Sequence, residues 1–506
     1  MALAFDWLAK RAELTPDAVA LVDAATGREY TYREFDDRAG RLAGFMLDEW
    51  RLSPGDRVAI LAHNCSEYFE ALFAAAKAGV VLVPLNWRLA IPELEGIVAD
   101  AAPAALVHDE AFADAAAALL PGIAGGSRMA IGHDAPAGAV ALETAITGAR
   151  NVVMGARPAG DLWYLLYTAG TTGRPKGVVQ TFEMALFNYL NIGIPIGLTE
   201  SDTTLNLLPT FHTGGINLYA MPTLLVGGTA IIQKSFEPEE TLRLLAERTT
   251  AFFGVPAVYL FLSQHPAFDE TDLSGVRSWA CGGAPMPVPL LERYAARGIA
   301  IRQGFGMTET GPTVFLVDED HAVSKAGSVG MPQMFVEVRI ADRQGRDVGA
   351  GEHGELLVRG PAVTPGYWNL PEVTAETIED GWLHSGDVAR RDEDGYFYIV
   401  DRWKDMYISG GENVYPAEVE NVLYGLPGVA EAAVIGIPDE RWGEVGRAVV
   451  VLEEGSEIST GEIIGFCSER LARFKVPKSV VFVDALPRNA AGKVLKQDLR
   501  SSHGTP

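Results

Sequence analysis

Cysteine is scarce in this chain of 506 residues: its three cysteines, Cys65, Cys281 and Cys467, lie far apart and form no CxxC pair. A thiolate metal cluster or a disulfide framework needs closely spaced or paired cysteines. The sequence therefore excludes both and favours a reducing, cytoplasmic compartment. The nine histidines show no HxxxH or HExxH spacing, so the common zinc-enzyme signatures are absent as well.

Positive charge is also in short supply. The chain has 41 Lys and Arg against 66 Asp and Glu, a net charge of −25. Such a field repels a phosphate backbone, which argues against a nucleic-acid partner. Any anionic substrate must be received by a local positive site that works against the field of the whole molecule.

Long hydrophobic runs are lacking too. The longest uncharged run, 216–232, is interrupted by Asn217, Pro222 and a glycine pair, and it falls short of the roughly 20 apolar residues of a membrane span. We predict a buried strand–loop–strand there, and at most peripheral membrane contact. The first 17 residues carry charges within their apolar pattern, which predicts an amphipathic helix and not a signal peptide.

Short apolar runs alternate with helical patterns over the first 400 or so residues. The stretch 57–63 predicts a strand, 66–79 a helix and 80–85 a second strand, and similar apolar runs recur at 227–233, 250–255 and 277–283. This alternation is typical of βαβ units around a parallel sheet. The fold class is therefore α/β.

The pattern changes from about Val329 to alternating strands with QG and DG turns, which predict a small antiparallel barrel or sheet. We place a domain boundary at 401–405, which gives a large N-terminal domain (1–401) and a small α+β C-terminal domain (402–506). In the latter we predict a helix over 417–424. A second helix begins at Ser459 with a capping box to Glu462, and its apolar positions continue in helical spacing through Ile463, Cys467, Leu471 and Phe474.

The stretch YTAGTTGRPKG (167–177) is unsuited to a core and suited to an anion, because glycine-rich turns expose backbone N–H groups and Lys176 adds a cation. It is not a Walker P-loop, since Pro175 precedes Lys176. The one Gly-Lys pair, at 492–493, has Pro487 where the first glycine belongs. A Rossmann fingerprint fails as well, because Glu309 replaces its last glycine. A plain structural turn remains the alternative for this stretch alone.

Further motifs stand downstream in a fixed order: PTFHTGG, GGAPMP, QGFGMTETGP, GWLHSGDVA, DRWKDMYISGGENVYPAEVE and PRNAAGKVLK. With them, the sequence resembles the adenylate-forming superfamily of acyl-CoA synthetases, luciferases and peptide-synthetase adenylation domains, over about residues 10–500. It looks most like bacterial fatty-acyl-CoA and feruloyl-CoA synthetases.

The resemblance implies an ATP site. Its phosphate cradle would be Thr168, Gly170, Thr171, Thr172, Gly173 and Lys176, with Ala169 standing where the family usually has Ser. The adenosine would contact Gly282, Gly283, Ala284 and Pro285 beneath the base, Phe305 stacked on it with Gly306 and Met307 beside it, and Asp387 and Arg402 at the ribose.

The resemblance also implies the catalytic groups. Thr308 would contact the α-phosphate, Glu309 would hold Mg²⁺ as a hard oxygen ligand, and His212 would stand beside the substrate carboxylate. Lys493 would bridge carboxylate and phosphate, where an ammonium opposes the repulsion of two anions. Lys404 would be the hinge of a mobile C-terminal domain, and Ser409, Gly410 and Gly411 would line the coenzyme A tunnel.

The expected activity is ATP-dependent ligation of a carboxylic acid to coenzyme A through an acyl-adenylate. Stretches 212–217 and 251–262 carry no Asp, Glu, Lys or Arg, so a second charge on the acid would be unpaired. We expect a medium- or long-chain fatty acid, with an aryl or hydroxycinnamate acid as the alternative, for which Asn217 and Tyr259 are candidate phenol partners. Only 13 residues follow Lys493, so we expect no carrier domain.

Two alternatives of other classes stay open from the sequence: a non-catalytic nucleotide-binding protein and a luciferase-like oxidase. The expected small-molecule partners are the acid, ATP and coenzyme A, with Mg²⁺ as cofactor, and a homodimer is an open alternative to a monomer.

Overall fold

The computed structural model describes residues 2–168, 175–402, 405–409, 412–439, 441–488 and 494–505. Its first large sheet has seven strands in the order β11-β10-β5-β4-β6-β7-β8. The parallel strands, in chain order, are β4 (Arg57–Leu61), β5 (Val81–Pro84), β6 (Ala105–His108), β7 (Ser127–Ala130), β8 (Val140–Ala141) and β10 (Leu162–Thr168). The edge strand β11 (Lys176–Thr181) returns antiparallel to β10.

The second large sheet has nine strands in the order β18-β17-β16-β15-β14-β12-β13-β2-β3. Its parallel strands are β2 (Val19–Asp23), β12 (Thr203–Asn206), β13 (Thr229–Ile232), β14 (Ala251–Gly254), β15 (Ser278–Cys281) and β16 (Ile301–Phe305). Antiparallel strands flank them: β3 (Glu29–Thr31), β17 (Phe315–Leu316) and β18 (Met331–Pro332). The predicted βαβ units and parallel sheets are confirmed.

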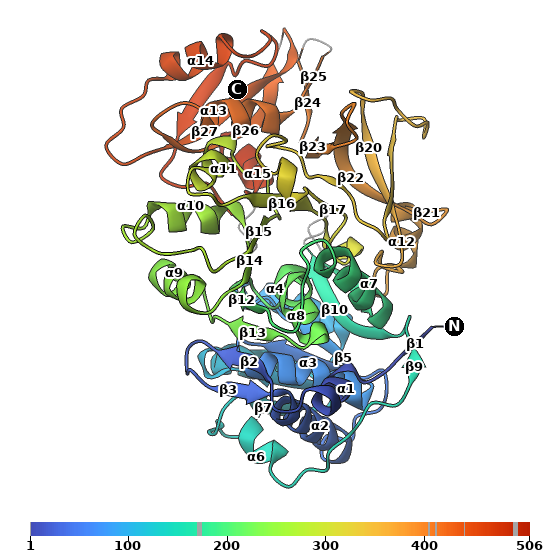
Figure 1. The fold of residues 1–506 in the computed structure, drawn as a ribbon. Helices are drawn as coiled ribbons and strands as arrows, with labels where there is room; N and C mark the ends of the chain where they lie inside the picture. The colour runs from blue at the N-terminus through green and yellow to red at the C-terminus, as the bar shows by residue number, and fades with distance from the viewer. Residues whose placement is uncertain are drawn as a thin grey trace.

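A shared layer of helices separates the two sheets (Figure 1). Its members are α1 (Trp7–Leu14), α2 (Tyr32–Asp48), α3 (Ser66–Ala78) and α8 (Ala220–Val226). Successive strand residues point to opposite faces, so Ile60 and Ile232 face this central core while Ala59 and Ile231 face two outer cores. The outer cores are closed by α4 (Ile91–Ala101) and α5 (Ala113–Leu119) on one side, and by α9 (Pro238–Glu247), α10 (Pro256–Gln264) and α11 (Val288–Ala295) on the other.

The prediction of a strand–loop–strand over 216–232 is wrong in its first half. A π-helical turn, Gly214–Leu218, leads into α8, and only β13 is a strand. Pro222 lies in the first turn of α8, where its missing N–H breaks no helical hydrogen bond. An apolar run buried on all sides carries no periodicity, so its sequence does not distinguish helix from strand.

A five-stranded antiparallel sheet follows, as predicted from the change of pattern at Val329. Its strands are β19 (Glu337–Ala341), β20 (His353–Arg359), β21 (Ile378–Glu379), β22 (Trp382–Arg391) and β23 (Phe397–Arg402), with α12 (Pro371–Thr377) beside β21. The remaining strands and α-helices up to β23 are a short ribbon of β1 (Leu3–Ala4) with β9 (Arg157–Pro158), and the helices α6 (Leu142–Ile146) and α7 (Phe182–Gly193).

The last hundred residues build their own sheet and core. The strands are β24 (Tyr407–Ser409), β25 (Glu412–Val414), β26 (Val429–Asp439), β27 (Gly443–Leu452) and β28 (Ser479–Phe482). The helices are α13 (Pro416–Tyr424), α14 (Thr460–Ser468) and α15 (Lys496–His503). This part lies at the top of Figure 1, in orange and red.

The capping box that begins α14 is confirmed, with Ser459 and Glu462 bonding each other's backbone N–H groups. The helix ends at Ser468, however, so Leu471 and Phe474 lie beyond it although they fit its spacing; they still pack on the same core. No helix in the described part of the chain is both long and apolar enough to cross a membrane.

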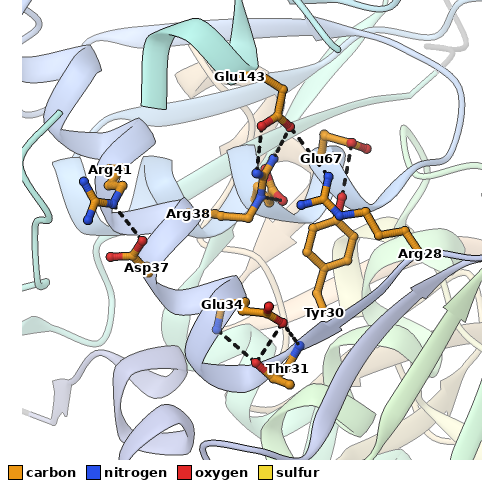
Figure 2. Close-up of polar contacts among 10 residues, drawn as sticks. Arg28, Tyr30, Thr31, Glu34, Asp37, Arg38, Arg41, Glu67 and Glu143 are labelled. Atoms are coloured by element: carbon orange, nitrogen blue, oxygen red, sulfur yellow. Dashed lines mark hydrogen bonds and ion pairs between the residues drawn. The ribbon is translucent and has the colours of Figure 1, made fainter. Parts of the chain in front are cut away.

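A buried arginine ties three helices of the N-terminal part together (Figure 2). Arg38 of α2 donates to both carboxylate oxygens of Glu70 on α3, at 2.5 and 3.1 Å, and to both of Glu143 on α6, at 2.6 and 3.0 Å. The Glu70 side chain is fully buried, and loss of hydration raises its pKa to about 7 against the attraction of Arg38. A carboxylate buried in this way stays charged without destabilising the fold only while its cationic partner is present.

We therefore expect Arg38→Ala to lower the free energy of unfolding by about 3–5 kcal/mol, because it leaves Glu70 buried without its cation. Arg41→Ala is the matched control one turn along α2, where Arg41 pairs with Asp37 at the surface (Figure 2), and its cost stays below about 1 kcal/mol. Urea unfolding of both variants measures the difference.

The deficit of Arg38→Ala should grow as pH rises. Unpaired Glu70 keeps its proton in the folded state, while the unfolded chain loses it above the ordinary value of 4.5. The folded state then binds more protons, so stability falls with rising pH. Equal losses in the two variants, or a loss that shrinks from pH 5 to 8, would contradict the assignment.

Candidate active site

The predicted phosphate loop joins two paired strands at the edge of the seven-stranded sheet. Strand β10 ends at Thr168 and β11 begins at Lys176, directly opposite it in the register. Of the cradle predicted from the sequence, Thr168 and Lys176 are therefore neighbours. The other predicted members, Gly170, Thr171, Thr172 and Gly173, lie outside the described residues, as does Ala169.

Two neighbouring parallel strands of the nine-stranded sheet deliver the predicted adenosine contacts. Strand β15 ends at Cys281, just before the predicted Gly282, Gly283, Ala284 and Pro285, and β16 ends at Phe305. A Cβ on Gly282 would lie 3.0 Å from the Phe253 ring and 3.2 Å from the carbonyl oxygen of Gly304, so the position is tight for any larger residue. Cys281 is a fully buried free thiol whose Sγ lies 3.4 Å from Met286 Sδ, as a small core residue.

Phe305 is half-buried, and its ring lies 6.2 Å from that of Phe315, at the border of the core beneath the antiparallel sheet. The chain then turns sharply, and a Cβ on Gly306 would overlap the carbonyl oxygen of Pro312, so only glycine fits there. Met307 donates its N–H to Thr310 Oγ1 at 3.0 Å across a short 3₁₀ turn, Thr308–Thr310.

That turn buries Glu309, which is 8% exposed. Its Oε1 accepts a hydrogen bond from the Tyr367 hydroxyl at 2.9 Å, and its backbone oxygen accepts the N–H of Thr364 at 2.8 Å. Burial raises the pKa of Glu309 above its ordinary value, and this effect outweighs the Tyr367 hydrogen bond and the positive charge of Arg402. A nearby cation would therefore stabilise the ionised form.

The side chains at this position suit a Mg²⁺ ion that is held partly by the protein and partly by a bound phosphate ligand. In the described ranges no three His, Cys, Asp or Glu side chains cluster as an all-protein metal cage would require. A single buried carboxylate is what a magnesium ion uses when phosphates and water fill its other positions. Glu309 fits that arrangement.

Asp387 and Arg402 face each other on adjacent strands. They are register partners of β22 and β23, and Arg402 Nε lies 2.8 Å from Asp387 Oδ1. Both side chains are predicted to lie at the ribose, and the structure brings them into one ion pair. Both charges act on Glu309, so residues from the nine-stranded and the antiparallel sheets meet here.

Buried amides that the sequence analysis missed connect the two large sheets beneath this site. Gln180 of β11 donates to the backbone oxygen of Thr308 at 3.0 Å, and Asn217 donates to Gln180 Oε1 at 3.4 Å. The Tyr164 hydroxyl donates to Asn217 Oδ1 at 2.6 Å. The only sequence signal for Gln180 and Tyr164 was their position next to the phosphate loop.

This network corrects the suggestion that Asn217 and Tyr259 serve a phenolic substrate. Asn217 is 1% exposed and engaged on both sides of its amide. Tyr259 is fully buried, and its hydroxyl donates to the carbonyl oxygen of Ala280 at 2.7 Å. The polar atoms of both side chains are therefore engaged in hydrogen bonds within the protein.

His212 lies in the loop after β12, where the carboxyl end of that strand approaches the carboxyl end of the seven-stranded sheet. Its Nε2 is buried and has no hydrogen-bond partner among the described residues. Burial lowers the pKa of His212 to about 4, and the charge of Arg88 acts in the same direction. The ring lies 4.9 Å from Phe211, which meets Trp87 edge-on at 6.0 Å. The imidazole is therefore neutral and set in an aromatic wall.

Asn64 holds this loop from the other sheet. Its Nδ2 donates to the carbonyl oxygens of Leu208 and Gln233 at 2.9 and 3.1 Å, and its Oδ1 accepts the N–H of Thr210 at 2.9 Å. With 5% exposure, Asn64 is a buried clamp from the end of β4. A lone Asn in HNCS gave no sequence signal for this role.

The predicted groups of the C-terminal part are described only in part. Ser409 is buried at the end of β24, opposite Glu412 and Gly443. Lys493, Lys404, Gly410 and Gly411 lie outside the described residues. Asp401, at the proposed boundary, accepts the N–H of Ala417 at 3.1 Å and so contacts the first turn of α13.

Known proteins are similar to this chain in sequence and in architecture. Residues 8–368 match the AMP-binding enzymes, and residues 418–493 match the AMP-binding enzyme C-terminal domain. The chain is 45% identical to a feruloyl-CoA synthase of an Amycolatopsis species, over 98% of each chain. It is 38% identical to a long-chain-fatty-acid–CoA ligase of Mycobacterium tuberculosis, over 98% of this chain and 97% of the other.

One solved structure adds ligands to the comparison. The o-succinylbenzoate coenzyme A synthetase of Bacillus subtilis, in complex with ATP and a magnesium ion, matches 99% of this chain and 100% of its own with a TM-score of 0.88 and 31% identity. The predicted fold class is confirmed by this likeness.

The neutral state of His212 gives a prediction. Its ring should not take up a proton between about pH 5 and 8, because burial opposes the charged form. Nitrogen-edited NMR of the histidine side chains should show a non-titrating signal for His212, which is identified by its loss in His212→Gln. Unfolded histidine has a pKa of 6.5, so this group destabilises the fold as pH falls from 6.5 towards 4. A midpoint near 6.5 for that signal would contradict the burial argument.

Proposed function

The chain belongs to the AMP-binding enzymes and is an AMP-forming acid–CoA ligase, and from that premise we propose that its acid is an aryl acid of the hydroxycinnamate type. The observation that carries the choice of acid is the 45% identity to a feruloyl-CoA synthase across 98% of both chains. The aromatic wall of Trp87 and Phe211 beside His212 supports it, because flat rings pack well edge-on.

The proposed reaction has two steps. A carboxylate oxygen attacks the α-phosphorus of ATP, the bond to the β-phosphate oxygen breaks, and acyl-adenylate and pyrophosphate form. The thiol of coenzyme A then attacks the acyl carbon, loses its proton and expels AMP, which leaves a thioester. No covalent bond to the enzyme is needed, so the protein supplies positioning and charge compensation.

Each predicted residue has a role in that scheme. Lys176 and the loop before it would hold the β- and γ-phosphates, Phe305 and Gly282 would bracket the adenine, and Asp387 with Arg402 would hold the ribose. Thr308 would contact the α-phosphate. When bound at Glu309, Mg²⁺ would supply neutralisation of phosphate charge, and the raised pKa of this buried carboxyl fits a group that is stabilised by a cation.

We further propose that residues 402–506 rotate as a unit about Lys404. Their separate sheet and core support this division. One orientation would bring Lys493 to the carboxylate and α-phosphate for the first step. The other would bring Ser409, Gly410 and Gly411 to the pantetheine arm for the second.

A medium- or long-chain fatty acid is the second candidate. The 38% identity to a long-chain-fatty-acid–CoA ligase favours it, as does the lack of charged side chains in 212–217 and 251–262. Asn217 and Tyr259 also form internal hydrogen bonds, so they do not serve as partners for the phenol of a hydroxycinnamate.

The test is kcat/KM for ferulate, benzoate, octanoate and palmitate, measured as pyrophosphate release with and without coenzyme A. We expect ferulate to exceed palmitate at least about tenfold, since even one methylene in an apolar pocket is worth roughly 10–200-fold. The reverse order would select the fatty acid. Pyrophosphate release without thioester would overturn the ligase assignment, and oxygen-dependent light would indicate an oxidase.

Lys493→Met should slow adenylate formation by about 10²–10³, because it removes the donor that compensates charge in the transition state. Thioester formation from synthetic acyl-adenylate should persist, since the second step uses the other orientation. Lys10→Met, a surface lysine paired with Glu13 on α1, is the control and should leave both steps unchanged. Adenylation at the wild-type rate in Lys493→Met would refute the role.

A further inference from the structure

One tyrosine outside every predicted motif contacts two of the predicted groups at once. The hydroxyl of Tyr367 donates to Glu309 Oε1 at 2.9 Å, and the Nζ of Lys176 lies over the Tyr367 ring, 5.2 Å from its centroid. We propose that Tyr367 is a positioning residue that holds the Glu309 carboxylate and the Lys176 ammonium in place and apart for a magnesium–nucleotide complex. This inference rests on the proposed function.

The backbone around Tyr367 is fixed by two neighbouring elements, β11 and α12. Residues 364–368 run antiparallel along the outer edge of β11: Val179 donates its N–H to Gly366 at 3.1 Å, and Trp368 donates to Gly177 at 2.7 Å. Tyr367 itself bridges to Val178 and donates its N–H to Thr374 Oγ1 of α12 at 2.9 Å.

The residue before it admits no substitute. Gly366 has a φ of +146°, and a Cβ there would lie 2.4 Å from a methyl carbon of Thr374. The backbone that carries Tyr367 is thus held by packing within the protein. A side chain on a fixed backbone can orient others at little entropic cost.

The hydroxyl orients the carboxylate. Since Oε1 accepts the Tyr367 hydroxyl, Oε2 is the oxygen that faces the cation in this proposal. Hydrogen bonds of this kind fix a ligating carboxylate and commonly change metal affinity by about 10–100-fold when removed.

The ring acts as a spacer. A lysine and a glutamate this close to one tyrosine would gain by pairing with each other, which would neutralise both. In the described part of the chain Lys176 and Glu309 form no ion pair, while the ammonium rests on the ring face through a cation–π contact. Each charge therefore stays available, the ammonium for phosphate oxygens and the carboxylate for a metal.

The test separates the two contacts by calorimetric titration of ATP into the full-length protein, with magnesium or with a chelator. Tyr367→Phe removes only the hydroxyl. We expect its Kd for ATP with magnesium to rise about tenfold, towards the lower end of such effects, and its Kd in chelator to stay unchanged.

Tyr367→Leu removes the ring face as well. It should additionally weaken ATP binding in chelator, by about three- to tenfold, because Lys176 is released from its support. Tyr396→Phe is the matched control: its hydroxyl also donates to a carboxylate, Asp318 Oδ2 at 2.6 Å, and Lys325 Nζ lies over its ring at 4.9 Å from the centroid, but it lies outside the predicted site, so both Kd values should match the wild type.

Thermal unfolding of each variant without ligand accompanies the titrations. A Tyr367→Phe protein that binds magnesium–ATP like the wild type overturns the proposal, and so does an equal loss with and without magnesium, since that is a merely structural effect. Nucleotide binding needs neither acid nor coenzyme A. An error about the acid would thus appear only in the turnover assay, and an error about Tyr367 only in these titrations.

Discussion

The shared helical layer between the two large sheets is the constraint on which the site depends. Both sheets pack on α2, α3 and α8, so their relative position is set by one continuous core. The ends of β10, β12, β15 and β16 consequently converge, and loops at the carboxyl ends of parallel strands are where ligands bind in open α/β sheets. Buried amides at Asn64, Gln180 and Asn217 then fasten one set of loops to the other.

Periodicity and turn residues were enough to predict the strands, the antiparallel addition after Val329 and the capping box at Ser459, because these depend on local sequence. The run 216–232 failed because full burial removes the polar face that distinguishes a helix from a strand. The helix from Ser459 was overextended because Leu471 and Phe474 share its core without continuing its backbone.

Site residues that belong to a sequence motif could be predicted. Residues that act only through a tertiary contact could not. Glu309, Asp387 and Arg402 stand in motifs, so resemblance found them, and the structure brings them together. Tyr367 and Asn64 act through partners 58 and 144 or more residues away, respectively. Such pairings arise from the way three sheets meet, which one sequence without its relatives does not reveal.

A net charge of −25 repels ATP over most of this surface. The cations at the site must therefore not be neutralised by neighbouring carboxylates. His212 is uncharged, so in the proposed reaction it contacts the acid without forming an ion pair with it. The acid's carboxylate therefore keeps its charge and its nucleophilicity. Its repulsion from the triphosphate must then be offset by other groups. The proposed spacer between Lys176 and Glu309, and the proposed arrival of Lys493 for the first step alone, both address that electrostatic problem.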